Sequence, residues 1–235
     1  SSPSSPGPWP TIIFQHGITR SRFDASAVAP LFAAFGFATI AMDAPLHGTS
    51  AENPYCTQLG VAASEFGLPG SERSFGMDLI NNETGEPGSD GFPEESGTYF
   101  LNFPSLISSR AVWTQAVCDL NALATAIPTW DIGDSAGIAD GTPDFTGDVY
   151  YVGQSLGALI GTTFLSSAEK GLIKGAELNV GGGHVAKLLE NSPNYNPRLM
   201  AFFEGEGLVQ GSTTAEQALN VISSVADGID PVNLV

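Results

Sequence analysis

The stretch that decides the fold is Asp-Val-Tyr-Tyr-Val-Gly-Gln-Ser-Leu-Gly, residues 148–157, followed by an Ala/Leu/Ile-rich segment up to about Ser167. Residues 148–152 predict a buried strand, and the segment after Gly157 predicts a helix. The turn between them fits the pattern Gly-x-Ser-x-Gly, which is specific in a strand–turn–helix setting. Glycines are needed there because a strained turn brings the helix close to the strand. We therefore expect Ser155 to be a nucleophile rather than an incidental serine in a glycine-rich connection.

Alternating strands and helices surround this turn. The first three elements, a strand, a helix and a strand within about thirty residues, favour a right-handed parallel crossover. Strands are expected at 11–15, 37–42, 148–152 and 174–180, and helices at 23–35, 105–127, 156–167, 184–190, 197–204 and 213–226. This order predicts an α/β fold, a doubly wound, mostly parallel sheet flanked by helices, with a ligand crevice at the carboxyl ends of the strands.

Residues 51–104 interrupt the alternation. Gly and Pro crowd this segment, and so long a stretch without a core of its own usually covers a site. We expect a lid-like insertion after the second strand, within one domain that spans 1–235, and a small hairpin that pairs 74–79 with 98–103. Its large apolar side chains either line an acyl pocket or form the insertion's own core: Phe66, Leu68, Phe75, Phe92, Tyr99, Phe100 and Phe103.

Two more segments end strands at the same crevice. The first is Gln-His-Gly-Ile-Thr, residues 15–19, where Gly17 lets the chain turn so that the next N–H faces the crevice. Acyl transfer needs two such donors for its oxyanion, and the amides of Ile18 and Leu156 are the expected pair. We expect His16, Gly17 and Gln154 to border the substrate, with His16 acting as a hydrogen-bonding residue of the loop.

The second of these segments is Asp-Ala-Pro-Leu-His-Gly, residues 43–48, which follows the end of the next strand. His47 is expected to brace this turn rather than to act as a base.

The composition excludes several classes of binding partner. Eight Lys and Arg against 25 Asp and Glu give a formal charge of −17, so the chain has no basic surface for nucleic acid or for anionic lipid. No apolar run is long enough to span a bilayer. Four aspartates could gather a calcium ion, but their spacing is not that of an EF-hand, and solvated loop carboxylates are the favoured interpretation: Asp134, Asp140, Asp144 and Asp148. No metal or cofactor is expected.

Only the composition of the chain indicates the cellular compartment of the protein. High acidity, few lysines and polar, Gly-rich loops are typical of secreted bacterial proteins. The sequence opens Ser-Ser-Pro-Ser-Ser-Pro-Gly without Met or a signal peptide, as at a processing boundary. Cys56 and Cys118 either pair in an oxidising compartment or remain two thiols, and two cysteines exclude a disulfide scaffold.

With the serine turn, the His-Gly loop and the Asp-x-Pro-x-His-Gly turn in this order, the chain resembles the α/β-hydrolase superfamily over about 11–48 and 105–190. Three further segments resemble secreted lipases of Gram-negative bacteria, including lysophospholipase-like members: Ile-Phe-Gln-His-Gly-Ile-Thr at 13–19, the insertion at 81–88, and Asp-Pro-Val-Asn at 230–233. The resemblance implies hydrolysis of carboxylic esters of acyl lipids, with Ser155 as nucleophile, no cofactor, and contact with a lipid surface.

The chain departs from that family after Ser155. The family order is nucleophile, acid, histidine, but only His184 follows, 29 residues on, with Asp227 and Asp230 behind it. This spacing is too short for the usual base, so we interpret the sequence as a piece of a larger hydrolase, with His184 as the fallback base. The alternatives are a non-catalytic lipid- or ligand-binding module without acid and base, and a different α/β-hydrolase chemistry such as peptidase or acyltransferase.

Overall fold

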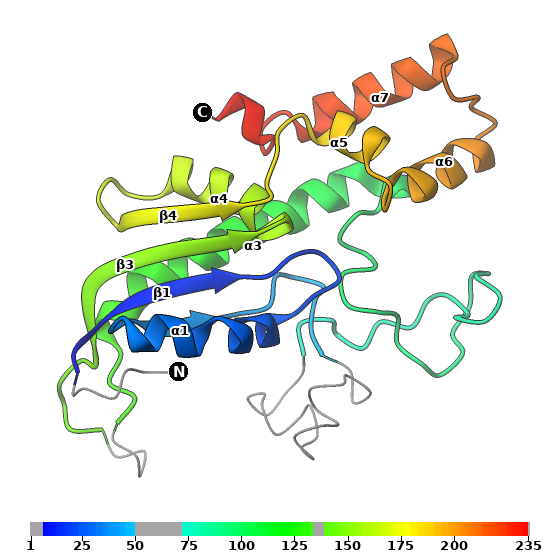
Figure 1. Cartoon of the computed structure of the whole chain (residues 1–235). Helices are drawn as coiled ribbons and strands as arrows, with labels where there is room; N and C mark the ends of the chain where they lie inside the picture. The colour runs from blue at the N-terminus through cyan, green and yellow to red at the C-terminus, as the bar shows by residue number, and fades with distance from the viewer. Residues whose placement is uncertain (1–6, 50–71, 134–138, 235) are drawn as a thin grey trace.

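The computed structural model describes residues 7–49, 72–133 and 139–234. In this part of the chain, four strands form one sheet in the order β2-β1-β3-β4, and every neighbouring pair is parallel (Figure 1). The strands are β1 (Trp9–Gln15), β2 (Ala38–Ala41), β3 (Phe145–Gln154) and β4 (Ile173–Asn179). The expected α/β class with a parallel sheet is confirmed.

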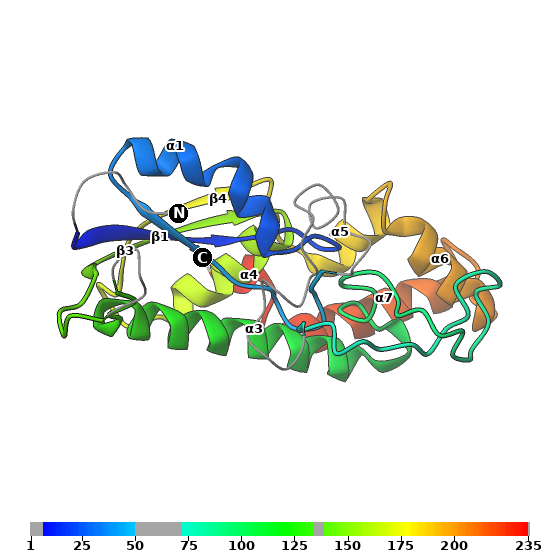
Figure 2. The ribbon, with the colours of Figure 1, turned by 90° about the horizontal axis from the view of Figure 1, so that it is seen from below.

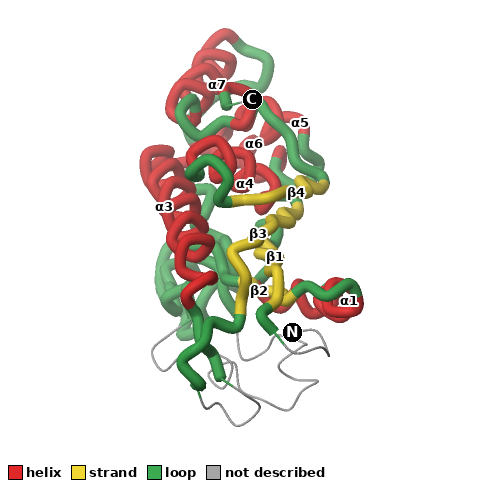
Figure 3. Tube along the Cα trace, turned by 90° about the vertical axis from the view of Figure 1, so that its left-hand side faces the viewer, coloured by secondary structure: helices red, strands yellow, loops and turns green. Residues whose placement is uncertain are grey.

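Helices cover both faces of the sheet. The long α3 (Leu106–Ala126) and α4 (Leu156–Ser167) lie on one face, and the short α1 (Ala29–Ala34) lies on the other (Figures 2 and 3). The helix expected over 23–35 is divided into a 3-10 turn, Arg22–Ala27, and α1. Pro30 explains the division, because it has no N–H to continue the hydrogen bonds of a preceding helix but is well tolerated in the first turn of a new one.

Three further helices lie beyond the carboxyl ends of the strands: α5 (Val185–Asn191), α6 (Asn196–Gly205) and α7 (Thr213–Ala226), which packs along α3 (Figure 1). Short 3-10 turns complete the described part at Phe103–Ser105, Ile127–Thr129 and Pro231–Asn233. The Ser212 side chain caps α7 by accepting a hydrogen bond from the amide of Ala215 at 3.2 Å. All three helices were expected from the sequence within a residue or two.

The core lies between the sheet and the α3–α4 layer. Tyr151 and Phe164 are fully buried there, with ring centroids 5.4 Å apart. Tyr151 also donates its hydroxyl to the carbonyl of Gly157 at 2.6 Å, which ties the central strand to the first turn of α4. A Cβ atom at Gly161 would overlap the Tyr151 ring, so α4 lies against β3 more closely than any other residue would allow.

The hairpin expected within the insertion is wrong. In the described residues from 72 to 102 the chain forms turns and bends, and the only bridge recorded there joins Ile80 to Pro87. Side chains take the backbone donors that a hairpin would use: Glu94 Oε1 accepts the amides of Leu79 and Ile80 at 2.8 and 2.6 Å. This competition from local polar side chains disfavours a regular ladder.

The large apolar residues of the insertion differ in how deeply they are buried. Phe100 is fully buried in the main core, Phe103 stacks on Phe202, and Phe75 and Phe92 are exposed. Neither alternative expected from the sequence describes the whole set. Phe66 and Leu68 lie outside the described residues.

Three other expectations meet the structure only in part. Cys56 lies outside the described residues, so its pairing with Cys118, which is exposed on α3, stays a prediction. Asp134 is also outside them, and in the described ranges no three potential metal-binding side chains gather. No helix among the described residues is long and apolar enough to cross a membrane.

Candidate active site

Ser155 occupies the turn between β3 and α4 with a strained backbone. Its φ is 54° and its ψ is −114°, a combination that residues with a Cβ rarely adopt. The turn is fixed on both sides: the Ser155 amide donates to the carbonyl of Asn179 at 2.9 Å, and the Ser155 carbonyl accepts from the amide of Ala158 at 2.9 Å. Strain held in this way is typical of a functional position, as expected from the Gly-x-Ser-x-Gly pattern.

The two glycines of the pattern are required by contacts. A Cβ at Gly157 would overlap the carbonyl of Gln15, and a Cβ at Gly153 would overlap the carbonyl of Gly157. A third glycine, Gly17, lies against the nucleophile, because a Cβ there would come 3.3 Å from that of Ser155. The serine turn and the end of β1 therefore share one tightly packed site.

The loop after β1 orients the Ile18 amide. The carbonyl of Gly17 accepts hydrogen bonds from His16 Nδ1 at 2.7 Å and from the Arg20 amide at 3.2 Å. In a trans peptide the N–H points opposite to the C=O, so the Ile18 N–H is directed away from these two donors. The amides of Ile18 and Leu156 donate to no other group within the described residues. Both therefore have a hydrogen to offer a bound oxygen.

Ser155 opens into a cleft of about 460 Å³, a volume within the usual range for small-molecule sites. Both apolar and polar side chains line it. The lining residues are Phe14, Gly17, Ile18, Thr19, Arg20, Asp24, Ala27, Val28, Gln154, Ser155, Asn194 and Tyr195. Gly17 and Gln154 thus border the cleft as expected, whereas His16 lies behind the loop and is fully buried.

His16 is neutral and fully engaged. Its Nε2 accepts the Ala44 amide at 3.0 Å, so the proton is on Nδ1, which donates to Gly17. Burial lowers the pKa of His16. With both nitrogens occupied, His16 cannot accept the Ser155 proton, and its role is to fix the loop.

His47 is also buried. Its Nδ1 donates to the carbonyl of Pro45 at 2.9 Å, and its Nε2 has no partner among the described residues. Burial lowers its pKa to about 3. The ring packs against His16, with centroids 4.9 Å apart, and against Phe100 at 5.2 Å. This geometry agrees with a brace for the turn after β2.

His184 is exposed and sits at the start of α5 with a left-handed backbone, φ 54°. Its ring makes no hydrogen bond within the described residues. Asp230 Oδ1 and Oδ2 instead accept the backbone amides of His184 and Val185 at 2.8 and 2.7 Å, so this buried carboxylate caps the helix. Across the described part of the chain, therefore, no histidine is hydrogen-bonded to Ser155.

Several residues of the cleft were missed by the sequence interpretation. Asn194 and Tyr195 lie just before and at the start of α6 and reach the cleft from far along the chain. Burial raises the pKa of Tyr195. Nothing local in the sequence marks either residue, because only tertiary packing brings the start of α6 to the end of β1.

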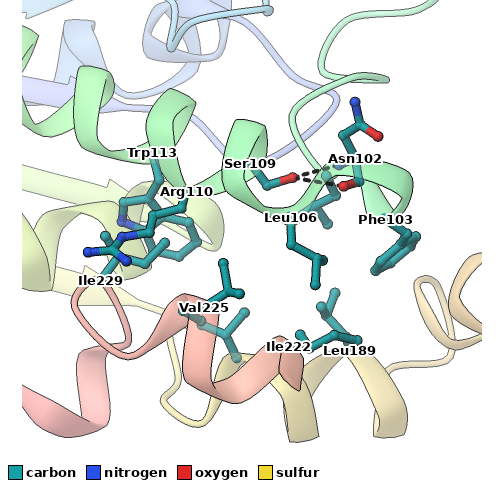
Figure 4. A pocket seen from close by; sticks show the side chains of 13 residues that line it. Asn102, Phe103, Leu106, Ser109, Arg110, Trp113, Leu189, Ile222, Val225 and Ile229 are labelled. Carbon is teal, nitrogen blue, oxygen red and sulfur yellow. Dashed lines mark hydrogen bonds between the residues drawn. The ribbon is translucent and has the colours of Figure 1, made fainter. Parts of the chain in front are cut away.

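A second cavity lies elsewhere and has a different character. It is smaller, about 40 Å³, and lies between α3, α5 and α7 (Figure 4). Leu106, Leu189, Ile222 and Val225 point into it, and its polar Ser109 is satisfied by the Asn102 backbone. It shares no lining residue with the Ser155 cleft, so it does not extend that cleft.

The fold and the site together define an α/β protein with a parallel sheet and a strained serine in the turn that joins the carboxyl end of β3 to α4. The sequence matches no protein-family model and no curated protein.

Proposed function

We propose that the chain carries the nucleophile of a serine carboxylic-ester hydrolase of the α/β-hydrolase type, a lipase or esterase that acts through an acyl-enzyme on Ser155. The observation that carries this proposal is the backbone of Ser155, with φ 54° and ψ −114°, at the mouth of a ligand-sized cleft. Strain of this kind persists only where the surrounding structure enforces it. The glycines at 153 and 157 permit the close packing around the turn, and the hydrogen bonds of the Ser155 amide and carbonyl hold it in place.

The proposed chemistry uses the groups around the cleft. The Ser155 hydroxyl adds to the ester carbonyl carbon while a base takes its proton, and the alcohol then leaves with a proton returned to it. Water hydrolyses the acyl-enzyme by the same two steps. The amides of Ile18 and Leu156 stabilise the oxyanion each time it forms. This scheme calls for no metal or organic cofactor.

The cleft suits an ester with one apolar and one polar part. Phe14, Ala27 and Val28 offer apolar contacts to an acyl chain, while Thr19 and Asn194 offer polar groups to the alcohol part. Acyl lipids, including lysophospholipids, have this division. Secretion or display at a bacterial surface, with contact to lipid, belongs to the same proposal.

The general base is the part that the described residues do not supply. His16 and His47 are buried with low pKa values, and the His184 ring is not bonded to Ser155. The described residues place no acid and base at Ser155, and His184, which is exposed, is the fallback base of this proposal. A serine without an adjacent imidazole is a poor nucleophile.

The same observation favours a second candidate, a module that binds acyl ligands without turning them over. The test is hydrolysis of p-nitrophenyl esters by the natural full-length protein and its Ser155→Ala variant. The proposal predicts a loss of at least about 10³-fold in kcat/KM. Ser166→Ala, on the same helix, is the matched control and should keep wild-type activity. Ligand binding without hydrolysis, unchanged in Ser155→Ala, would favour the second candidate.

A further inference from the structure

The loop that presents the Ile18 amide, residues 16–22, is tied down at its far end by a charged cluster. The Arg22 amide donates to Asp43 Oδ1 at 2.6 Å, and its guanidinium pairs with Asp43 Oδ2. The Asp43 side chain is only 1% exposed. Asp43 follows β2, so the end of the loop is fixed to the neighbouring strand.

The same guanidinium holds a second carboxylate. Arg22 Nη1 and Nη2 donate to Glu72 Oε2 and Oε1 at 2.7 and 2.9 Å, a bidentate pair that fixes both side chains. Glu72 also accepts the Thr49 amide at 3.1 Å. Its hydrogen bond with Arg22 lowers the pKa of Glu72, so the carboxylate stays charged. Glu72 belongs to the insertion after β2, not to the sheet.

A second residue of the insertion reaches the middle of the loop. Ser96 Oγ donates to the carbonyl of Arg20 at 2.8 Å and accepts the Gly48 amide at 3.2 Å. The loop is therefore tied at its start by His16, in its middle by Ser96 and at its end by Arg22. The Ile18 amide lies between the first two of these ties.

Stability alone is a weak reason for such a cluster. Two carboxylates share one guanidinium, and the desolvation of a partly buried ion group often cancels its Coulombic gain. What the cluster does provide is a fixed geometry, since a bidentate pair restrains distance and angle together. An oxyanion donor gains from that restraint, because its contribution depends on being in place before the charge develops.

We infer that Arg22, Asp43, Glu72 and Ser96 are positioning residues for the Ile18 amide, so that the insertion acts on the transition state as well as bordering the site. This inference rests on the proposed function. It differs from a covering role, because a cover would change substrate binding, whereas a positioned donor changes the chemical step.

The test is Glu72→Gln in the full-length enzyme, which keeps an acceptor for Thr49 but removes the charge that holds Arg22. We expect kcat and kcat/KM to fall together by about tenfold, part of the 10²–10³ lost when an oxyanion donor is removed outright, with KM unchanged. The Ki of a trifluoromethyl ketone, which forms an oxyanion on the serine, should rise by the same factor. Ser96→Ala should change both quantities in the same direction by less.

Asp119→Asn is the matched control. It breaks the ion pair between Asp119 and Arg73, the neighbour of Glu72, but leaves in place the hydrogen bond from Arg73 to the Asp43 carbonyl and both carboxylates on Arg22. Its kcat should stay within about twofold of wild type. An unchanged kcat in Glu72→Gln, a rise in KM alone, or an equal loss in Asp119→Asn would overturn the inference. Covalent labelling of Ser155 alongside any of these results would show that the proposed function stands while the positioning role fails.

Discussion

The amide of Ser155 donates to the carbonyl of Asn179 at 2.9 Å, which joins the nucleophile's turn to the last residue of β4. Ser155 is therefore held from three directions: by β3, which it follows, by α4, which it begins, and by the neighbouring strand. Its side chain is left to open into the cleft. This anchoring is what allows an unfavourable φ of 54° to persist.

Gly157→Ala is expected to destabilise the protein and disable the site. The new Cβ would overlap the backbone carbonyl of Gln15, and neither backbone segment can move without breaking the β1–β3 pairing. We expect a loss of about 2–4 kcal/mol in the free energy of unfolding, as for other overpacked sites. Urea denaturation measures it. Gly147→Ala, where a Cβ would meet open space, should stay within about 0.5 kcal/mol, and equal losses in the two variants would contradict the packing argument.

His47 is expected to make stability fall as the pH drops below 7. Its folded pKa of about 3 lies well below the unfolded value of 6.5, so the unfolded chain binds a proton first. Between pH 7.5 and 5.5 this should cost about 1.4 kcal/mol of unfolding free energy. The loss would continue until the pH approaches 3. Burial also lowers the pKa of His16, so this residue adds a loss of unfolding free energy of the same sign.

The variant His47→Gln separates the two histidines. Between pH 7.5 and 5.5, the unfolding free energy of this variant should change less with pH than that of the wild type, and the difference is the contribution of His47 alone. Identical slopes in urea titrations of the two proteins would show that His47 does not titrate as described.

Asp230→Ala should uncap α5. Its carboxylate accepts the amides of His184 and Val185, and both lose their partner in the variant. We expect a loss of about 1–2 kcal/mol in unfolding free energy. Asp227→Ala serves as the control, since among the described residues the Asp227 carboxylate accepts only from exposed Asn233. A larger loss of unfolding free energy in the control would contradict the capping role of Asp230.

His184→Ala should leave ester hydrolysis by the full-length protein within a few-fold of wild type, because its exposed ring makes no hydrogen bond among the described residues. A loss of about 10³-fold or more in His184→Ala, with the fold intact, would instead make His184 the base.

Much of this fold could be predicted because its signals are local. The apolar runs of β1 and β3, the periodicity of α3 and α7, and the Gly-x-Ser-x-Gly turn each lie within one short stretch. The error in the insertion was also local in cause: side chains such as Glu94 and Asp78 bind backbone amides and prevent the pairing that residue propensities suggest.

The position of the candidate site was predictable for the same reason, although His16, expected at its border, is buried instead. Ser155, Ile18 and Leu156 follow from two motifs at strand ends, since parallel strands bring their carboxyl ends to one edge. The ion cluster could not be foreseen, because Arg22 meets partners 21 and 50 residues away. Sequence spacing carries no information on such pairs, because only the tertiary fold brings the partners together.

The central claim is that Ser155 is a covalent nucleophile, and active-site phosphonylation tests it most directly. The full-length protein is treated with a fluorophosphonate and digested, and the modified peptide is identified by mass spectrometry. The account predicts one adduct, on Ser155, that is absent from Ser155→Ala and retained in Ser166→Ala. An adduct on another serine, or labelling that survives Ser155→Ala, would contradict it.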